Sequence, residues 1–323
     1  MKAIRIQAHG DADAMSLVDI DEPQPGRGEI RVRHHAIGVN FIDTYHRSGL
    51  YKIALPSGLG AEAAGLIDAI GANVTRFKPG DRVGYCTAPI GAYAQAHVIN
   101  EAVAVKLPER VSFDIAAASM LKGMTARYLL RKTFRVERGH IVVIHAAAGG
   151  VGQIATQWAK HLGAFVIATV GSDGKAEIAR ALGADHVIVT SRENIAERVR
   201  EITNGAGAHV VYDGVGKDTW DASLDSLRRF GMMVSYGNAS GAIPPFSPLV
   251  LSAKGSLYLT RPTLFHYTAD PADLDETAAD LFAMIEQGAV KIAPPKRCAL
   301  ASAAQAHADL EARKTTGSLV LIP

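Results

Sequence analysis

Short stretches in the first third of the chain have the hydrophobic pattern of β-strands. Ile30 to Val39 alternates between polar and apolar residues, and Ala63 to Ile70 is a largely apolar run. Lys78 to Asp81 has the composition of a turn and precedes a further expected strand at Arg82 to Tyr85. We therefore expect a mainly β domain in this part of the chain.

The pattern changes to helical spacing at about Ser112. A helix is expected through Ala116 and on to Lys132, with Gly123 as a joint and a domain boundary near Lys122. Strands and helices then alternate, with strands expected at 141–145, 165–170, 186–189, 210–213 and 232–236, and helices at 151–162, 175–182, 193–203 and 219–228. Repeated strand–helix units predict a doubly wound parallel sheet, so the expected fold class is α/β.

The part of the chain after residue 260 has helical spacing at 274–287 and 301–312 and a last expected strand at 318–322. We expect this tail to fold back onto the first domain. The predicted domains are therefore residues 1–122 together with 261–323, and residues 123–260.

The amino-acid composition favours an ordered, two-domain protein that binds a small molecule. With 323 residues, 48% of them hydrophobic, the chain is long enough for two ordered domains. The 34 basic and 32 acidic residues are balanced, which argues against nucleic acid or a membrane surface as a partner and favours a small molecule. Cys86 and Cys298 are too few for a disulfide framework or a four-cysteine zinc site, and they favour the reducing cytoplasm as location.

A glycine-rich turn is the strongest local motif. The apolar strand Ile141 to His145 runs directly into residues 146–152, AAAGGVG, and then into an apolar helix. This fits the dinucleotide fingerprint as Ala147-x-Gly149-x-x-Gly152, with alanine in place of the first glycine. Gly149 and Gly150 would let the backbone approach a pyrophosphate, and Gly152 would let the helix pack closely on the strand. The alternative is a tight turn without a ligand, but the flanking strand–helix units favour a dinucleotide.

The end of the next expected strand indicates NADPH rather than NADH. NAD-binding folds have an acidic residue there that binds both ribose hydroxyls, whereas this strand ends at Val170-Gly171-Ser172. We expect the 2′-phosphate to meet Ser172, Lys175 and the N-terminus of the helix that Lys175 opens, with Ser191 or Arg192 on the far side. Two alternatives stay open: Asp173 could be the N-cap of that helix, and Lys175 could be an ordinary solvated lysine.

Several further segments resemble a known family. Asn40 to Tyr45, Leu55 to Gly65 and Lys78 to Val83 are similar to the N-terminal domain of medium-chain dehydrogenases/reductases, and the similarity continues through the glycine turn to Gly317–Pro323. Together with Leu121 to Thr125, these segments most resemble the zinc-free, zeta-crystallin-like quinone oxidoreductases. The resemblance covers the whole chain and implies a Rossmann domain that binds NADPH and a mainly β, GroES-like catalytic domain.

The same resemblance implies an enzyme without zinc. Zinc-dependent members have a cysteine where this chain has Asn40 and a histidine where it has Ala61. Their structural zinc needs four cysteines, and this chain has only Cys86 between residues 85 and 100. His34 and His35 do not provide a replacement, because neighbours on a strand point to opposite faces.

The resemblance also implies two groups of site residues. Asn40, Asp43 and Tyr45, with Tyr51 as a secondary candidate, would orient the nicotinamide carboxamide and the acceptor. The expected cofactor-binding residues are Phe41, Thr125, Gly149, Gly150, Val151, Gly171, Ser172, Lys175, Ser191, Tyr236, Gly237, Asn238, Thr260, Arg261 and Arg313. Alternatives remain for three residues: Asn40 could cap the helix expected at Phe41 to Arg47, Arg313 could be an exposed helix-end charge, and Asp213 could be only a turn residue.

The activity that the resemblance implies is metal-free reduction of quinones by NADPH, through hydride or electron transfer. A quinone accepts electrons readily because its product is aromatic, whereas an alcohol is hard to oxidise without a Lewis acid. The nearest alternative is an enone or enal reductase on the same fold. An alternative of another class is a non-catalytic NADPH-binding protein, crystallin-like or RNA-binding. We also expect a homodimer formed through an edge strand at Gly255 to Leu259.

Overall fold

The computed structural model describes residues 1–87 and 89–323, and these divide into two compact units. The first unit contains Met1–Leu121, Thr268–Phe282 and Ile292–Pro323, and the second contains Lys122–Tyr267 and Ala283–Lys291. The units differ from the domains expected from the sequence in the last part of the chain, because residues 261–267 and 283–291 pack with the second unit.

A seven-stranded sheet forms the centre of the first unit. Its strands follow the order β15-β16-β3-β5-β6-β8, and β7 also pairs with β3. The bounds are β3 Glu29–Val39, β5 Ala63–Ile70, β6 Arg82–Tyr85, β7 Ala96–Asn100, β8 Val105–Lys106, β15 Lys296–Ala299 and β16 Leu319–Ile322. Strand β16 runs antiparallel to β3 and pairs Leu319 with Val39, so the last part of the tail folds back onto the N-terminal part of the chain as expected, whereas residues 261–267 and 283–291 do not.

A smaller sheet and several helices complete the first unit. The smaller sheet has the order β2-β1-β4, with β1 Lys2–Ile6, β2 Met15–Asp19 and β4 Ser57–Gly58. Helix α1 spans Phe41–Ser48 and α10 spans Ala303–Glu311; α9 spans Pro271–Glu286, and its residues up to Phe282 belong to this unit. An apolar cluster that includes Ile37, Leu59, Tyr93 and Leu321 fills the space between these elements.

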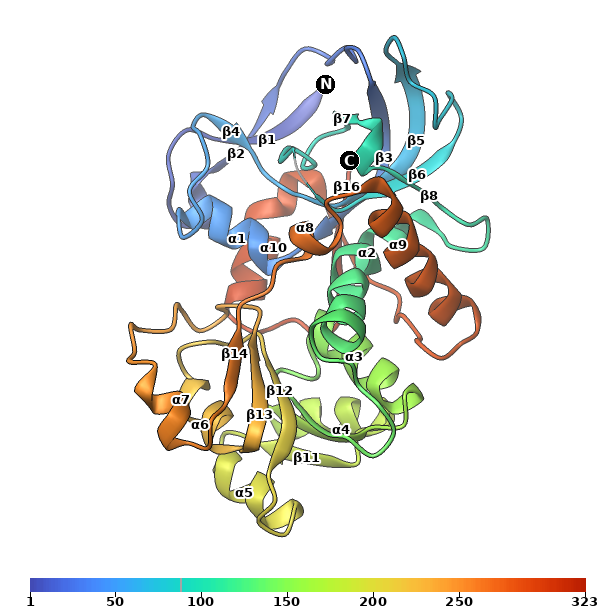
Figure 1. The fold of residues 1–323 in the computed structure, drawn as a ribbon. Coiled ribbons are helices and arrows are strands. Elements are labelled where there is room, and N and C mark those ends of the chain that lie inside the picture. The colour runs from blue at the N-terminus through green and yellow to red at the C-terminus, as the bar shows by residue number, and fades with distance from the viewer. Residues whose placement is uncertain (88) are drawn as a thin grey trace. The chain divides into compact units, whose positions relative to one another are not determined.

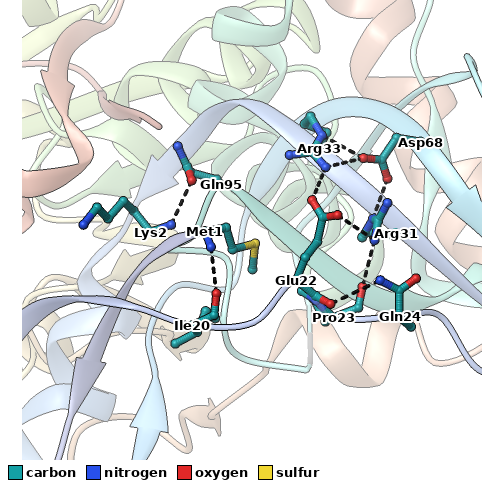
Figure 2. A network of polar contacts seen from close by, with 10 residues as sticks. All are labelled: Met1, Lys2, Ile20, Glu22, Pro23, Gln24, Arg31, Arg33, Asp68 and Gln95. Carbon is teal, nitrogen blue, oxygen red and sulfur yellow. Dashed lines mark hydrogen bonds and ion pairs between the residues drawn. The ribbon is translucent and has the colours of Figure 1, made fainter.

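A group of charged residues holds the segment after β2 against the large sheet (Figure 2). Asp68 on β5 accepts hydrogen bonds from Arg31 Nε and Arg33 Nε, both at 2.7 Å. Glu22 forms ion pairs with the same two arginines, and Arg31 Nη1 also donates to the Pro23 carbonyl oxygen at 3.2 Å. Because Glu22 and Arg33 are partly exposed, their ion pair fixes the course of residues 22–24 more than it stabilises the fold.

Helix α2 spans Phe113–Tyr128 and continues as a turn of π-helix over Leu129–Thr133. The expectation of a joint at Gly123 is wrong, because the helix passes through that residue without a break. Most side chains around it are buried, and this tertiary packing outweighs the low helix propensity of one glycine.

The second unit is a six-stranded parallel sheet with the order β11-β10-β9-β12-β13-β14. Its strands are β9 Ile141–Ile144, β10 Phe165–Val170, β11 His186–Val189, β12 Ala208–Asp213, β13 Leu227–Ser235 and β14 Tyr258–Thr260. The strand order reverses between β9 and β12, and this is the point at which doubly wound sheets bind ligands. The doubly wound α/β fold expected from the sequence is therefore confirmed.

The helices of this unit are α3 Gly150–His161, α4 Asp173–Ala181, α5 Ile195–Ile202, α6 Trp220–Asp225, α7 Leu249–Ala253 and α8 Leu264–Tyr267. Figure 1 shows α6 and α7 on the side of β13 and β14, whereas α3 and α4 pack against β9, β10 and β11. The helix expected to reach Arg228 ends earlier, at Asp225, because the chain has already entered β13 at Leu227.

Candidate functional site

The candidate site residues form two groups, one in each unit. The larger group lies in the second unit, where parallel pairing places the carboxyl ends of all six strands along one edge of the sheet. The smaller group lies around the N-terminus of α1 in the first unit. Arg313 belongs to the first unit and follows α10 with a φ of 58°, in the left-handed region that few non-glycine residues adopt.

The glycine turn connects β9 directly to α3. Gly149 is the N-cap of α3, and its backbone N–H donates to the Ala146 carbonyl oxygen at 2.8 Å. A Cβ atom at position 152 would lie 2.4 Å from the same oxygen, so only glycine lets α3 start this close to the strand. A Cβ atom at position 150 would lie 2.6 Å from the Lys122 side chain. A helix N-terminus that follows such a glycine turn is suited to bind an anion such as a pyrophosphate.

The expected 2′-phosphate site follows β10. Helix α4 begins at Asp173, two residues before the start expected at Lys175, and Ser172 is its N-cap. Asp173 is therefore not the N-cap, and the Ser172 side chain makes no capping hydrogen bond. Arg192, after the neighbouring strand β11, forms an exposed ion pair with Asp173 at 2.7 Å. Ser191 is exposed beside it, and Lys175 is half buried in the first turn of α4.

Residues after β12, β13 and β14 meet at the other half of the edge. The Tyr236 ring lies over Gly214, where a Cβ atom would be 2.8 Å from the ring, and a Cβ atom at position 237 would lie 2.5 Å from the Gly214 carbonyl oxygen. Asn238 follows in the same loop. Arg261 Nη1 donates to the Ser235 carbonyl oxygen at 2.8 Å, which brings the end of β14 next to the end of β13. The edge therefore holds Tyr236, Gly237, Asn238, Thr260 and Arg261 together; Thr125 is buried on α2.

Asp213 at the end of β12 is more than a turn residue. Its fully buried carboxylate accepts hydrogen bonds from the backbone of Val215 and Gly216 and from the hydroxyls of Thr219 and Ser223, at 2.7 to 3.0 Å. These bonds fix the loop that leaves the strand at the reversal point of the sheet.

His145 extends this arrangement to β10. Its Nε2 lies 2.9 Å from Ser223 Oγ and its Nδ1 lies 2.8 Å from Thr169 Oγ1. Burial lowers the pKa of His145, so the ring is neutral at neutral pH. Because the Ser223 hydroxyl donates to Asp213, His145 Nε2–H donates to Ser223 and the Thr169 hydroxyl donates to Nδ1. The hydrogen bonds thus run in one direction, from Thr169 through His145 and Ser223 to Asp213, and they connect the carboxyl ends of β10, β9 and β12.

In the first unit, Asn40 and Asp43 form a capping box at the N-terminus of α1. The Asp43 carboxylate accepts the Asn40 backbone N–H at 2.8 Å. The Asn40 side-chain amide donates to Glu62 Oε2, also at 2.8 Å, and Glu62 Oε1 accepts the Leu121 N–H at 2.7 Å. The capping role of Asn40 is therefore confirmed, and a carboxylate fixes the orientation of its amide because a carboxylate only accepts.

Aromatic rings cover the same helix. The Tyr45 ring lies edge-on to Tyr51, with centroids 5.2 Å apart, and tilted to Phe41 at 6.3 Å. The Tyr51 N–H donates to the Tyr45 carbonyl oxygen at 3.0 Å, which folds the chain after α1 back onto the helix. The structure thus brings Asn40, Asp43, Tyr45 and Tyr51 together on and beside α1.

Asn40 and Ala61 stand where the resemblance places the cysteine and histidine ligands of zinc-dependent dehydrogenases. The Asn40 amide is turned to Glu62, and Ala61 has no ligand atom. Across residues 1–87 and 89–323, no three histidine, cysteine, aspartate or glutamate side chains are grouped to hold a metal ion. Among the same residues, no helix is both long and apolar enough to cross a membrane.

Comparisons with known proteins agree with this geometry. Residues 26–109 match the alcohol dehydrogenase GroES-like domain, and residues 150–281 match the zinc-binding dehydrogenase family. The chain is 52% identical to a quinone oxidoreductase of Pseudomonas aeruginosa, over 100% of this chain and 99% of the relative. It therefore belongs to the quinone oxidoreductases of the medium-chain dehydrogenase/reductase family.

Two further relatives show the range of this family. The crystal structure of Escherichia coli quinone oxidoreductase complexed with NADPH is 47% identical, covers 100% of both chains and has a TM-score of 0.98. A 2-haloacrylate reductase of Burkholderia is 44% identical over 98% of both chains. The mixed fold of a Rossmann sheet and a β-rich, GroES-like unit is thus shared with these proteins.

The sequence did not reveal four polar residues close to Asn40. Glu62, Tyr93, Arg47 and His307 are all buried and connect with Asn40 or Asp43 through hydrogen bonds. Neither the neighbours of His307 in the sequence nor the spacing of the histidines indicates a partner for it.

Proposed function

We propose that this protein is a metal-independent quinone reductase that uses NADPH. One observation carries the proposal: the turn at residues 146–152 keeps the close glycine packing of a dinucleotide site at Gly152, whereas the Asn40 amide, at the position of a zinc ligand, is bound to Glu62. A bound nicotinamide would supply the hydride. The protein then needs to hold the acceptor and exclude water, since reduction of a quinone requires no Lewis acid.

The residues along the carboxyl edge of the second unit fit NADPH. Gly149, Gly150 and Val151 would hold the pyrophosphate at the N-terminus of α3. Ser172 and Lys175 would hold the 2′-phosphate, with Gly171 and Ser191 beside it. We propose that the residues after β13 and β14 line the rest of the cofactor: Tyr236, Gly237, Asn238, Thr260 and Arg261.

The residues around α1 suit the acceptor. We propose that Asn40, Asp43, Tyr45 and Tyr51 orient the nicotinamide carboxamide and the quinone, with Phe41, Thr125 and Arg313 as further cofactor contacts. The phenol groups can donate to a quinone oxygen as negative charge develops on it. The small number of cysteines supports a reducing cytoplasm as the location of the enzyme.

The decisive experiment measures NADPH oxidation with a panel of ortho-quinones, para-quinones and enones. We expect turnover with quinones, and we expect EDTA to leave the rate unchanged. Loss of activity on chelation, together with stoichiometric zinc in the purified protein, would contradict the metal-independent mechanism.

A second candidate function is reduction of an activated carbon–carbon double bond, which the similarity to 2-haloacrylate reductase favours. Turnover of enones or haloacrylates without any turnover of quinones would replace the first proposal with this one. Tight NADPH binding without turnover of any acceptor would instead indicate a non-catalytic binding protein.

A further inference from the structure

A buried chain of hydrogen bonds connects α10 with the N-terminus of α1 inside the first unit. Arg47 Nη1 lies 3.3 Å from His307 Nδ1, His307 Nε2 lies 2.9 Å from Tyr93 Oη, and Tyr93 Oη lies 3.0 Å from Asp43 Oδ2. Arg47 is 1% exposed, and the other three residues are fully buried. We call these four residues the Asp43 relay.

The direction of every bond in the Asp43 relay follows from Arg47, because a guanidinium only donates. His307 Nδ1 therefore accepts, so the ring proton sits on Nε2 and donates to Tyr93. The Tyr93 hydroxyl then donates to Asp43 Oδ2, the same oxygen that accepts the Asn40 backbone N–H. Burial and the Arg47 charge lower the pKa of His307 to about 3, so the ring is neutral at neutral pH, as this pattern requires.

The outer end of the Asp43 relay is also held in place. The Glu311 carboxylate of α10 accepts hydrogen bonds from Arg47 Nη2 at 2.7 Å and from Nη1 at 3.0 Å. Arg47 Nε donates to the Gly10 carbonyl oxygen at 3.0 Å. Burying the charged Arg47 and Asp43 costs desolvation free energy. Burial of apolar residues of similar volume would stabilise α1 as well, so the benefit of the relay is a single defined geometry at its inner end.

We propose that Tyr93 and His307 are positioning residues for the reaction, which hold Asp43 and, through it, the backbone of Asn40. Through Asp43 they hold the backbone N–H of Asn40, while Glu62 fixes the orientation of the Asn40 side-chain amide. The inference rests on the proposed function, since that function assigns Asn40 to the nicotinamide end of the cofactor. It adds two residues, 50 or more positions away from Asp43 in the sequence, to those that determine the rate.

The first unit offers a matched control for the hydroxyl of Tyr93. Tyr85 is also fully buried, and its hydroxyl forms a hydrogen bond with a buried histidine, His34 Nε2, at 2.9 Å. His34 Nδ1 bonds the Ala94 carbonyl oxygen, so this pair has no connection with Asp43 through the bonds described. Tyr85→Phe and Tyr93→Phe each remove one tyrosine–histidine bond from the same unit, and Tyr93→Phe also removes the bond to Asp43. A purely structural role predicts a loss of stability in both variants without a change in kcat or in cofactor fluorescence.

The experiment compares wild type, Tyr93→Phe and Tyr85→Phe in kcat, quinone KM, NADPH Kd, Tm and the fluorescence spectrum of bound NADPH. We expect both variants to lower Tm, and Tyr93→Phe more than Tyr85→Phe because it also removes the bond to the buried Asp43 carboxylate. Only Tyr93→Phe should lower kcat, by about tenfold, while NADPH Kd stays within about twofold of wild type. Only Tyr93→Phe should change the nicotinamide fluorescence, because only this variant alters Asn40.

A second pair of variants tests His307. His307→Gln keeps one donor and one acceptor and should retain most of the wild-type kcat, whereas His307→Leu should lose as much as Tyr93→Phe. Equal kcat and unchanged nicotinamide fluorescence in Tyr93→Phe and Tyr85→Phe would overturn the proposal and leave the relay a structural feature. If wild type reduces no quinone, the proposed function fails, and the fluorescence comparison alone decides whether the Asp43 relay positions Asn40.

Discussion

The choice between NADPH and NADH depends on single side chains at the start of α4. We predict that Lys175→Ala raises the preference for NADH, because the ammonium group would bind the 2′-phosphate that only NADPH carries. Loss of one partly exposed charge-assisted hydrogen bond should cost NADPH about 1.5 to 3 kcal/mol, or roughly ten- to a hundredfold in kcat/KM. The measurement is kcat/KM for both cofactors in wild type and variant.

Lys106→Ala is a suitable control for this change, since Lys106 is an exposed lysine of the first unit. It should leave both values of kcat/KM unchanged. If wild type uses NADH as well as NADPH, or if Lys175→Ala weakens both cofactors equally, the 2′-phosphate does not bind at this position.

At the scale of elements, the contact between β9 and α3 makes Gly152 indispensable. We predict that Gly152→Ala weakens NADPH binding by at least about tenfold and destabilises the second unit by about 1 to 3 kcal/mol. The added methyl group would lie 2.4 Å from Ala146 O, which is backbone, so α3 must move away from the turn. Isothermal titration with NADPH and thermal unfolding measure the two effects.

Gly10→Ala provides the comparison for this substitution. At Gly10 an added Cβ atom meets only the Ala14 Cβ, at an ordinary 3.4 Å, so the variant should bind NADPH as the wild type does. Wild-type NADPH affinity in Gly152→Ala would show that the glycine turn does not set the cofactor position.

The elements of the second unit could be predicted because each strand is a short apolar run and each helix repeats its apolar positions locally. Boundaries failed where tertiary contacts decided them, as at Gly123 and at the end of α6. The glycine turn and the residues of α1 are local motifs and could be recognised. The Asp43 relay could not, because Asp43, Tyr93 and His307 come from three distant segments and only the folded sheet brings them together.

For the molecule as a whole, buried histidines make stability depend on pH. Burial lowers the pKa of both His34 and His307 to about 3, compared with 6.5 for an ordinary histidine. The unfolded chain therefore binds protons between about pH 6.5 and 3 that the folded chain does not, so stability rises with pH across this window. We predict that Tm falls as the pH falls below about 6.5. Each histidine lowers the free energy of unfolding by up to about 1.4 kcal/mol per pH unit.

Thermal unfolding of wild type, His34→Gln and His161→Gln between pH 4 and 8 checks this prediction. His34→Gln should have a shallower dependence than the wild type, whereas His161→Gln, which changes an exposed residue of α3, should not. A Tm that is independent of pH across this range would contradict the prediction.

A homodimer is the expected assembly. Strand β14 is an edge of the six-stranded sheet in the described chain, and Tyr258 on it, Phe230 and Leu249 are 59, 63 and 77% exposed. Exposed edges with apolar side chains tend to be covered by another chain. We predict a dimer at micromolar concentration that Tyr258→Glu converts to a monomer, as measured by sedimentation velocity. A monomeric wild type would contradict this assembly.

The pairing of β16 with β3 has a consequence for how the chain is made. During synthesis the strand that precedes Asn40 emerges early, but its neighbour Leu319–Ile322 follows about 280 residues later. Most of the second unit is one continuous segment, Lys122–Tyr267, and can close its sheet while the rest is still being translated. Strands β5 and β7 can pair with β3 early, but the end of β3 next to Asn40 stays without its partner until β16 is made. The part of the first unit that is assigned to the acceptor is therefore the last to complete its sheet.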